Sequence, residues 1–224
     1  MKTFAIGDVH GCFDALLAVV QLAGISEEDR VVWLGDFVDR GPDSAKVIQH
    51  LSQLPADNNV CLRGNHEIMM QNARGSMHSM RSWATSGGGE TWDSYIRDYG
   101  GDNGIQSVPD EHWAFIDGLT AYFETDTHIF VHAALDSEVE MADQFDDALY
   151  WADFDSIGPH ISGKHVVCGH TSQKDGVPKS RSHATCIDTW ACGSGWLTCL
   201  EVQTGRYYQA KQTGETRSDW LSQT

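Results

Sequence analysis

The sequence predicts an α/β fold, and three features of the residue pattern support this prediction. In the first half, short apolar runs alternate with amphipathic stretches. A long stretch with helical periodicity follows, and the second half is rich in apolar runs separated by turn residues. Because 41% of the 224 residues are hydrophobic, the chain can form one well-buried core. We therefore expect a single domain over residues 1–224, with a helical insertion over about residues 67–119.

The first half predicts a regular succession of strands and helices. Strands are expected over Thr3–Gly7, Arg30–Leu34 and Val60–Leu62, and helices over Phe13–Ala23 and Ser44–Leu54. Asp43 or Ser44 is a suitable N-cap for the second helix. This alternation is typical of a right-handed parallel α/β unit.

The rest of the chain changes character twice. From His66 to about Leu119 the pattern is helical, and the glycines at 87–89 and 100–101 interrupt it. Beyond this point we expect strands over His128–His132, Lys164–Cys168, Ala184–Ile187, Leu197–Val202 and Tyr207–Ala210. The last ten residues are polar, and we expect them to be loose.

The composition argues against several classes of protein. A formal net charge of −17 repels nucleic acid, so we expect no DNA or RNA partner. No run approaches the roughly 18 apolar residues of a membrane span, and the first residues leave no room for a signal peptide. The six cysteines form no C-x-x-C pair, so we interpret them as reduced. We expect a cytoplasmic protein without a membrane partner.

Three short motifs follow the first three predicted strands. They are Gly7-Asp8-Val9-His10-Gly11, then Gly35-Asp36-Phe37-Val38-Asp39-Arg40-Gly41, then Arg63-Gly64-Asn65-His66-Glu67. In an open α/β sheet, ligands bind at the carboxyl ends of the strands, so these motifs should converge. Asp8 and His10 are two residues apart on extended chain and should point the same way.

Two strands of the second half each end in a histidine, His132 and His170. Carboxylate, imidazole and amide oxygen together suit ions such as Mn²⁺, Fe²⁺ or Zn²⁺. Six residues can therefore hold two ions, with Asp36 as the bridge: Asp8, His10, Asp36, Asn65, His132 and His170.

Each motif alone has a simpler explanation. An Asp-x-His sequence is usually a turn or a cap, and Asn65 by itself would be a turn residue. His132 could be a hydrogen-bonded core histidine, and Asp39–Pro42 a turn with a local ion pair. The occurrence of five such motifs, each at a strand end, favours a metal centre over these separate explanations.

The three motifs, followed by two isolated histidines, resemble the phosphoprotein phosphatase family of metallophosphoesterases. The similarity is to its short bacterial and bacteriophage serine/threonine protein phosphatases, and it runs from Lys2 to about Arg206. It includes Ser86–Gly89 with Trp92, and Ile187–Thr189 near the end. This resemblance implies a four-layered α/β/β/α sandwich with two mixed β-sheets and metals between loops at one edge.

The resemblance also implies a role for each residue. Asp8, His10 and Asp36 would hold the first metal, and Asp36 would share the second with Asn65, His132 and His170. The ions would be manganese, with iron or zinc as alternatives. The catalytic residues would be His66 and Asp39. His66 would protonate the leaving oxygen, and Asp39 would orient the ring of His66. Arg40 and Arg63 would bind phosphate oxygens.

One feature departs from the family pattern. Family members commonly supply another phosphate-binding arginine between the two metal histidines, but no arginine occurs between His132 and His170. The sequence leaves Lys164, Lys174 and Arg181 open as substitutes.

Our leading interpretation is a phosphomonoester hydrolase that attacks with water held between two metals. Its substrate would be phosphoserine or phosphothreonine in a protein, also phosphotyrosine, or a small phosphoester. A symmetrical dinucleoside tetraphosphate hydrolase is the first alternative; the scarcity of basic residues after His132 disfavours it, and the tryptophan-bearing insertion favours it. A non-catalytic metal-binding scaffold is the alternative from another class. The sequence does not predict the oligomeric state.

Overall fold

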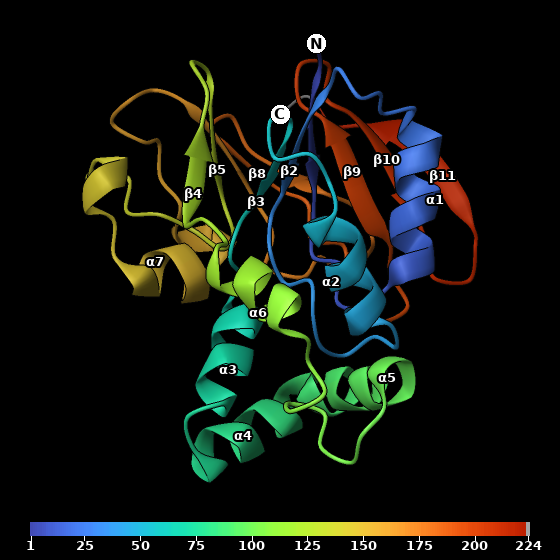
Figure 1. Cartoon of the computed structure of the whole chain (residues 1–224). Helices are drawn as coiled ribbons and strands as arrows, with labels where there is room; N and C mark the ends of the chain where they lie inside the picture. Colours follow the sequence, from blue (N-terminus) through green and yellow to red (C-terminus); the bar gives the residue numbers. More distant parts are fainter. Residues whose placement is uncertain (223–224) are drawn as a thin grey trace.

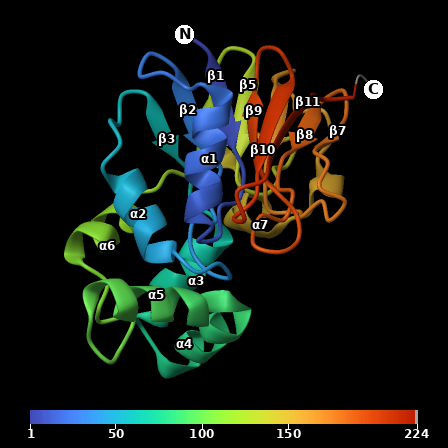
Figure 2. The ribbon, with the colours of Figure 1, turned by 90° about the vertical axis from the view of Figure 1, so that its right-hand side faces the viewer.

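The computed structural model describes residues 1–222, which form two mixed β-sheets packed face to face with helices outside them (Figures 1 and 2). This is the predicted α/β/β/α sandwich. None of the helices in this described range has the length and apolar character needed to cross a membrane.

The first sheet has six strands in the order β11-β10-β9-β1-β2-β3. Strands β1, β2 and β3 pair in parallel, as the alternation of strands and helices predicted, whereas β9, β10 and β11 add antiparallel. The strands are β1 (Thr3–Ile6), β2 (Arg30–Trp33), β3 (Asn59–Cys61), β9 (Leu197–Glu201), β10 (Arg206–Ala210) and β11 (Thr216–Trp220).

The second sheet has five strands in the order β4-β5-β6-β8-β7. Its central strands β5, β6 and β8 are parallel, and β4 and β7 pair antiparallel at the two edges. The strands are β4 (Tyr122–Glu124), β5 (His128–Val131), β6 (His165–Cys168), β7 (Lys179–Ser180) and β8 (Ala184–Cys186).

Alternating side chains divide the core into three layers. On β1, Phe4 and Ile6 pack under the helices α1 (Phe13–Ala23) and α2 (Ser44–Ser52), whereas Ala5 faces the second sheet. On β5 the pattern repeats, because Phe130 lies between the sheets and its neighbours pack under α7 (Asp146–Trp151). The period of two along each strand therefore builds a buried layer on both faces of both sheets.

A group of helices lies between β3 and β4 in the chain, at the lower end of the molecule in Figure 1. These helices are α3 (Asn65–Ala73), α4 (Met77–Trp83), α5 (Gly89–Tyr99) and α6 (Asp110–Asp117). A π-helical turn over Ala84–Gly88 joins α4 to α5 and is kinked at Gly87, whose φ is 111°. The helical periodicity predicted for this stretch is confirmed, and the glycine interruption is this kink.

Several predicted bounds and elements differ from the structure. The polar end of the chain is not loose over 216–220, because these residues form β11 by pairing with β10. Helix α2 ends at Ser52, two residues before the predicted end, and its N-cap Asp43 binds Arg97 at 2.9 Å instead of the helix N–H groups. Helix α7 was not predicted.

Candidate metal centre

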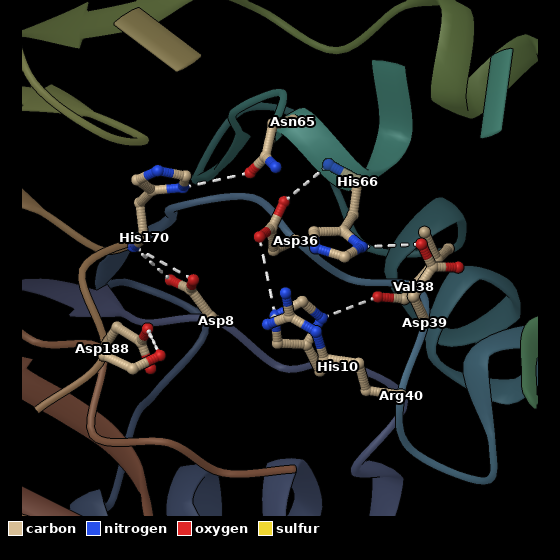
Figure 3. Close-up of polar contacts among 12 residues, drawn as sticks. Asp8, His10, Asp36, Val38, Asp39, Arg40, Asn65, His66, His170 and Asp188 are labelled. Carbon is tan, nitrogen blue, oxygen red and sulfur yellow. Dashed lines mark hydrogen bonds and ion pairs between the residues drawn. The ribbon is translucent and has the colours of Figure 1, made fainter. Parts of the chain in front are cut away.

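The six predicted ligands lie on loops at the carboxyl ends of parallel strands, and these loops meet at one edge of the two sheets (Figure 3). Asp8 and His10 follow β1, Asp36 follows β2, and Asn65 begins the helix after β3. His132 and His170 follow β5 and β6 of the second sheet. Four of the six, His10, Asp36, His132 and His170, form two compact groups together with His66. The groups are His10–Asp36–His66 and Asp36–His132–His170, and within each the ligand atoms lie within 4.8 Å of one another.

Asp36 lies at the centre of both groups. Its Oδ2 is 3.6 Å from His10 Nε2, and its Oδ1 is 3.5 Å from His132 Nε2. The two oxygens thus face different histidines, which is the arrangement that a bridging carboxylate needs. Gly64 makes room for this, because a Cβ there would lie 2.1 Å from Asp36 Oδ1.

The two buried histidines are held as neutral acceptors. Nδ1 of His10 donates to the carbonyl of Val38, and Nδ1 of His132 donates to the carbonyl of Leu34, both at 2.8 Å. Each Nε2 is therefore an acceptor that faces into the site, as in histidines that ligate metals. Burial lowers the pKa of both rings, for His10 to about 3, so both remain neutral near pH 7.

Asn65 brings a further acceptor to the second group. Its Oδ1 is 3.0 Å from His132 Nε2 and 3.1 Å from His170 Nδ1. Because the ring of His132 carries its proton on Nδ1, its Nε2 and the Asn65 oxygen face each other as two acceptors. Such a pair is favourable when a cation lies between them, so the residues fit a divalent ion.

Asp8 makes its hydrogen bonds to the loop after β6 of the second sheet. Its oxygens accept the backbone N–H of His170 at 3.1 and 3.0 Å, and a Cβ on Gly169 would lie 2.0 Å from Oδ1. Burial raises the pKa of Asp8, and the nearby carboxylates of Asp188 and Asp36 raise it further. A bound divalent cation would offset this concentration of negative charge.

Asp188 is a buried carboxylate of this site to which the sequence analysis gave no role. It accepts the Ser172 hydroxyl at 2.5 Å and the backbone N–H of Trp190 at 2.9 Å. It therefore ties the loop after β8 to the loop that carries His170.

The backbone of the site is strained at five residues that are not glycine. Positive φ angles occur at His10, Asp36, Asp39, Arg40 and His170, with values from 44° to 75°. Each such conformation costs about 1–3 kcal/mol and persists only where the surroundings impose it. The strain falls on residues that the motifs predicted, which is where strained backbone is usually found.

Glu67 imposes part of this strain, although the sequence analysis gave it no role. Its carboxylate accepts four backbone N–H groups, from Asp36, Phe37, Val38 and Gly64, at 2.7–3.2 Å. The available signal was its position three residues after the helix cap Gly64, which is the spacing of a capping box. That spacing predicts the bond to Gly64 and not the three bonds to the distant loop.

His66 and Asp39 form a buried pair beside the two groups. His66 Nδ1 lies 2.7 Å from Asp39 Oδ2, so the ring donates to the carboxylate, and its other nitrogen has no hydrogen-bond partner among residues 1–222. Burial alone lowers the pKa of His66, but the carboxylates of Asp36 and Asp39 outweigh it and raise the pKa. The ring can therefore carry a proton into the site.

The two predicted phosphate-binding arginines have different surroundings. Arg40 lies at the centre, with Nη1 2.8 Å from His10 Nε2. Arg63 lies beside the C-terminal end of α6, where its Nη2 donates to the carbonyls of Asp117 and Leu119 at 3.1 and 3.2 Å. The structure thus brings Arg40 to the predicted ligands, while Arg63 is partly engaged in holding α6.

Two of the three possible substitutes for the missing arginine pair with carboxylates. Lys164 binds Glu124 at 2.8 Å, and Arg181 binds Asp155. Lys174 lies with Nζ 5.5 Å from the ring centre of Trp190, next to the loop that holds Asp188.

Comparison with known proteins agrees with this geometry. The family model for calcineurin-like phosphoesterases matches residues 1–174, which contain all six predicted ligands. The chain belongs to the calcineurin-like phosphoesterase family. Membership supports a metal-dependent phosphoesterase and implies divalent metal ions.

Curated relatives match only a short segment. The symmetrical bis(5'-nucleosyl)-tetraphosphatase of Legionella pneumophila strain Lens is 41% identical over 69 residues, 30% of this chain and 25% of that protein. The Salmonella arizonae protein of the same name is 42% identical over 69 residues, 30% of this chain and 24% of that protein. The aligned segment thus spans about a quarter of the length of these relatives.

Solved structures share the fold over nearly the whole chain. A candidate diadenosine tetraphosphatase has a TM-score of 0.67 at 18% identity, covering 98% of this chain and 93% of that one. A protein serine/threonine phosphatase from Saccharomyces cerevisiae has a TM-score of 0.65 at 18% identity, covering 100% of this chain and 81% of that one. At this identity, the likeness shows the fold alone.

Proposed function

We propose that this phosphoesterase hydrolyses dinucleoside tetraphosphates symmetrically, giving two nucleoside diphosphates. The observation that carries the choice of substrate is the match to symmetrical bis(5'-nucleosyl)-tetraphosphatases over the 69-residue segment. The motifs alone favour a protein phosphatase, and these relatives support the alternative, the tetraphosphate hydrolase, better.

The ligand geometry supports two divalent ions in the site. Asp36 would bridge them, Asp8 and His10 would complete one set, and the other set would be Asn65, His132 and His170. Such ions, when bound, lower the pKa of water and stabilise charge that develops on phosphate oxygens. We propose manganese, with iron or zinc as alternatives, because the donors combine carboxylate, amide and imidazole.

The other residues of the site would act on the substrate directly. The guanidinium of Arg40, whose Nη1 lies 2.8 Å from His10 Nε2, would release that nitrogen to a metal ion and donate two parallel hydrogen bonds to phosphate oxygens. Lys174 would be a further cation for a polyphosphate chain, and Arg63 would assist from the edge of α6. His66 would donate a proton from its free nitrogen to the departing oxygen, while Asp39 holds its Nδ1.

The His66–Asp39 pair favours a second candidate, hydrolysis of phosphoserine or phosphothreonine in proteins. A departing nucleoside diphosphate is a weak base, because the second ionisation of a terminal phosphate has a pKa of about 6. A departing alkoxide is a strong base and needs a proton from an acid in the site. The buried pair is thus more useful for monoesters than for a dinucleoside tetraphosphate.

The deciding experiment compares Mn²⁺-loaded protein on diadenosine tetraphosphate and on a phosphoserine peptide. Chromatography of the nucleotides tests the symmetry of cleavage, because symmetrical hydrolysis gives only ADP, whereas asymmetrical hydrolysis gives ATP and AMP. We expect ADP as the sole nucleotide product and a higher kcat/KM than for the peptide. A preference for the peptide would move the assignment to the protein phosphatase.

A substitution of His66 tests its role as the acid. We predict that His66→Asn retains two bound metals but loses about a hundredfold in kcat on phenyl phosphate, whose leaving group is poor. Turnover of p-nitrophenyl phosphate should fall much less, because its leaving group departs without a proton. Metal content from elemental analysis is the control, and equal losses on both esters would remove His66 from this role.

A further inference from the structure

The carboxylate of Asp39 receives more hydrogen bonds than the pairing with His66 requires. Trp83 Nε1 lies 3.0 Å from Oδ1 and 2.9 Å from Oδ2, and the hydroxyl of Thr91 lies 2.8 Å from Oδ1. Oδ2 remains the acceptor for His66 Nδ1 at 2.7 Å. Trp83, Thr91 and Asp39 are all 0–1% exposed, so these bonds form away from water.

Both additional donors come from the helices between β3 and β4 and are separated from Asp39 by more than forty residues. Trp83 is the last residue of α4, and Thr91 lies in the first turns of α5. The backbone N–H of Asp39 donates to the Thr91 hydroxyl oxygen at 2.7 Å, so Thr91 holds both the backbone and the side chain of Asp39.

The indole ring of Trp83 is itself fixed in place. A Cβ on Gly88 would lie 2.4 Å from two of its ring atoms, so the glycine backbone packs directly on the ring. The adjoining Gly87 contacts Arg40, because the carbonyl of Gly87 accepts the backbone N–H of Arg40 at 2.9 Å. The turn Ala84–Gly88 therefore places the indole on Asp39 and supports Arg40 at the same time.

These contacts restrict what Asp39 can do. With Oδ1 bound by Thr91 and both oxygens bound by Trp83, the carboxylate cannot rotate to offer His66 a different angle. A fixed Oδ2 keeps the proton of His66 on Nδ1 in the neutral ring, so its other nitrogen faces the site. In a reaction that depends on orientation, misplacement of about 1 Å can cost about a hundredfold in rate.

We propose that Trp83 and Thr91 are positioning residues that set the orientation of His66 through Asp39. This inference depends on the proposed role of His66 as the acid. Through these residues, the helices between β3 and β4 take part in proton donation as well as in covering the sheet.

The test uses substitutions that remove a hydrogen-bond donor and leave an apolar side chain in its place; Thr91→Val also keeps the shape, whereas Trp83→Phe shortens the ring system. Trp83→Phe removes the indole N–H, and Thr91→Val removes the hydroxyl. Trp92→Phe is the matched control, since Trp92 lies on the same helix as Thr91 and packs against Gly104, away from Asp39. All variants are prepared with Mn²⁺, and metal content and circular dichroism are compared with the unsubstituted protein.

We expect Trp83→Phe and Thr91→Val to lower kcat on phenyl phosphate about tenfold, with little change on p-nitrophenyl phosphate. Trp92→Phe should leave both rates unchanged. Combining Trp83→Phe with His66→Asn should add no further loss, since both act on one proton transfer. Equal losses on the two esters, or additive losses in the double variant, would overturn the inference.

A second readout does not depend on turnover. Nitrogen–proton correlation spectra of the histidine side chains, recorded on metal-free protein at a pH high enough for the His66 ring to be neutral, should show His66 as a single Nδ1–H tautomer. We expect mixed tautomers in Trp83→Phe and Thr91→Val, and an unchanged spectrum in Trp92→Phe. An unchanged His66 tautomer in both variants would contradict the inference even if a variant were too unstable to assay. If His66→Asn itself leaves the ratio of rates on the two esters unchanged, the acid assignment falls instead.

Discussion

Glu67 concentrates four backbone hydrogen bonds on one buried carboxylate. Three of its donors belong to the strained loop after β2, and the fourth is the cap of α3. The side chain therefore joins the loop that carries Asp36 to the helix that carries Asn65 and His66. A residue outside the predicted ligand set thus fixes the relative position of two predicted ligands and His66.

We predict that Glu67→Gln lowers the free energy of unfolding by about 1–3 kcal/mol, because the amide nitrogen turns a donor toward buried N–H groups. Urea denaturation of the metal-free protein measures this directly. Glu28→Gln is the control, since the side chain of Glu28 is exposed. If the two variants have equal stability, Glu67 does not hold the loop in the way that its contacts indicate.

Side chains at strand ends could be identified from the sequence, because a ligand directly after an apolar run has a predictable place. This applies to Asp8, Asp36, His132 and His170, which the structure brings to one edge. Trp83 and Thr91 could not be identified, since their contacts with Asp39 arise from the packing of separate helices. Tertiary hydrogen bonds of this kind leave no periodic signal in the sequence.

Among the elements, β11 shows why a polar segment can be misinterpreted. All five of its residues are exposed, so it lacks the alternation of apolar side chains that predicts a strand. Its stability comes from the ladder with β10 and from Arg217, whose guanidinium stacks on Trp196 at 4.3 Å. By contrast, β1 and β2 were predictable because most of their residues are buried and apolar.

Strands β5 and β6 place two histidines side by side. His128 pairs in register with His165, and their ring centres are 5.7 Å apart. Burial and, to a smaller extent, the charge of His165 together lower the pKa of His128 from 6.5 to about 4. Protonation of this pair therefore opposes folding.

We predict that this pair makes the protein less stable in mild acid. Between pH 6.5 and about pH 4, the unfolded chain binds a proton at His128 that the folded chain does not bind, so stability falls as the pH falls. Above pH 6.5 the residue is neutral in both states and has no effect. Urea denaturation as a function of pH should show a shallower acid loss in His128→Gln than in the unsubstituted protein.

His78→Gln is the control for this experiment, since its side chain is exposed on α4. It should retain the acid loss of the unsubstituted protein. An acid loss that stays equally steep in His128→Gln would show that other groups cause it.

Across the whole molecule, the site joins two sheets that otherwise meet through apolar side chains. Asp8, His10 and Asp36 belong to loops of the first sheet, while His132 and His170 belong to the second. The layer between the sheets includes Leu34, Phe130 and Val167, whose strands end at this site. Divalent ions bound between these loops would therefore connect the sheets with metal–ligand bonds.

From this we predict that metal stabilises the whole fold. Ions that bind only the folded state at about 100 times their Kd add about 2.7 kcal/mol to the free energy of unfolding. For a chain of this size that raises Tm by about 5–10 °C, and the chelator EDTA should reverse the shift. Calorimetry should show one transition, because both sheets contribute ligands. Asp36→Asn, which weakens the bridge, should lose most of the shift, and a Tm insensitive to both Mn²⁺ and EDTA would contradict a metal centre between the sheets.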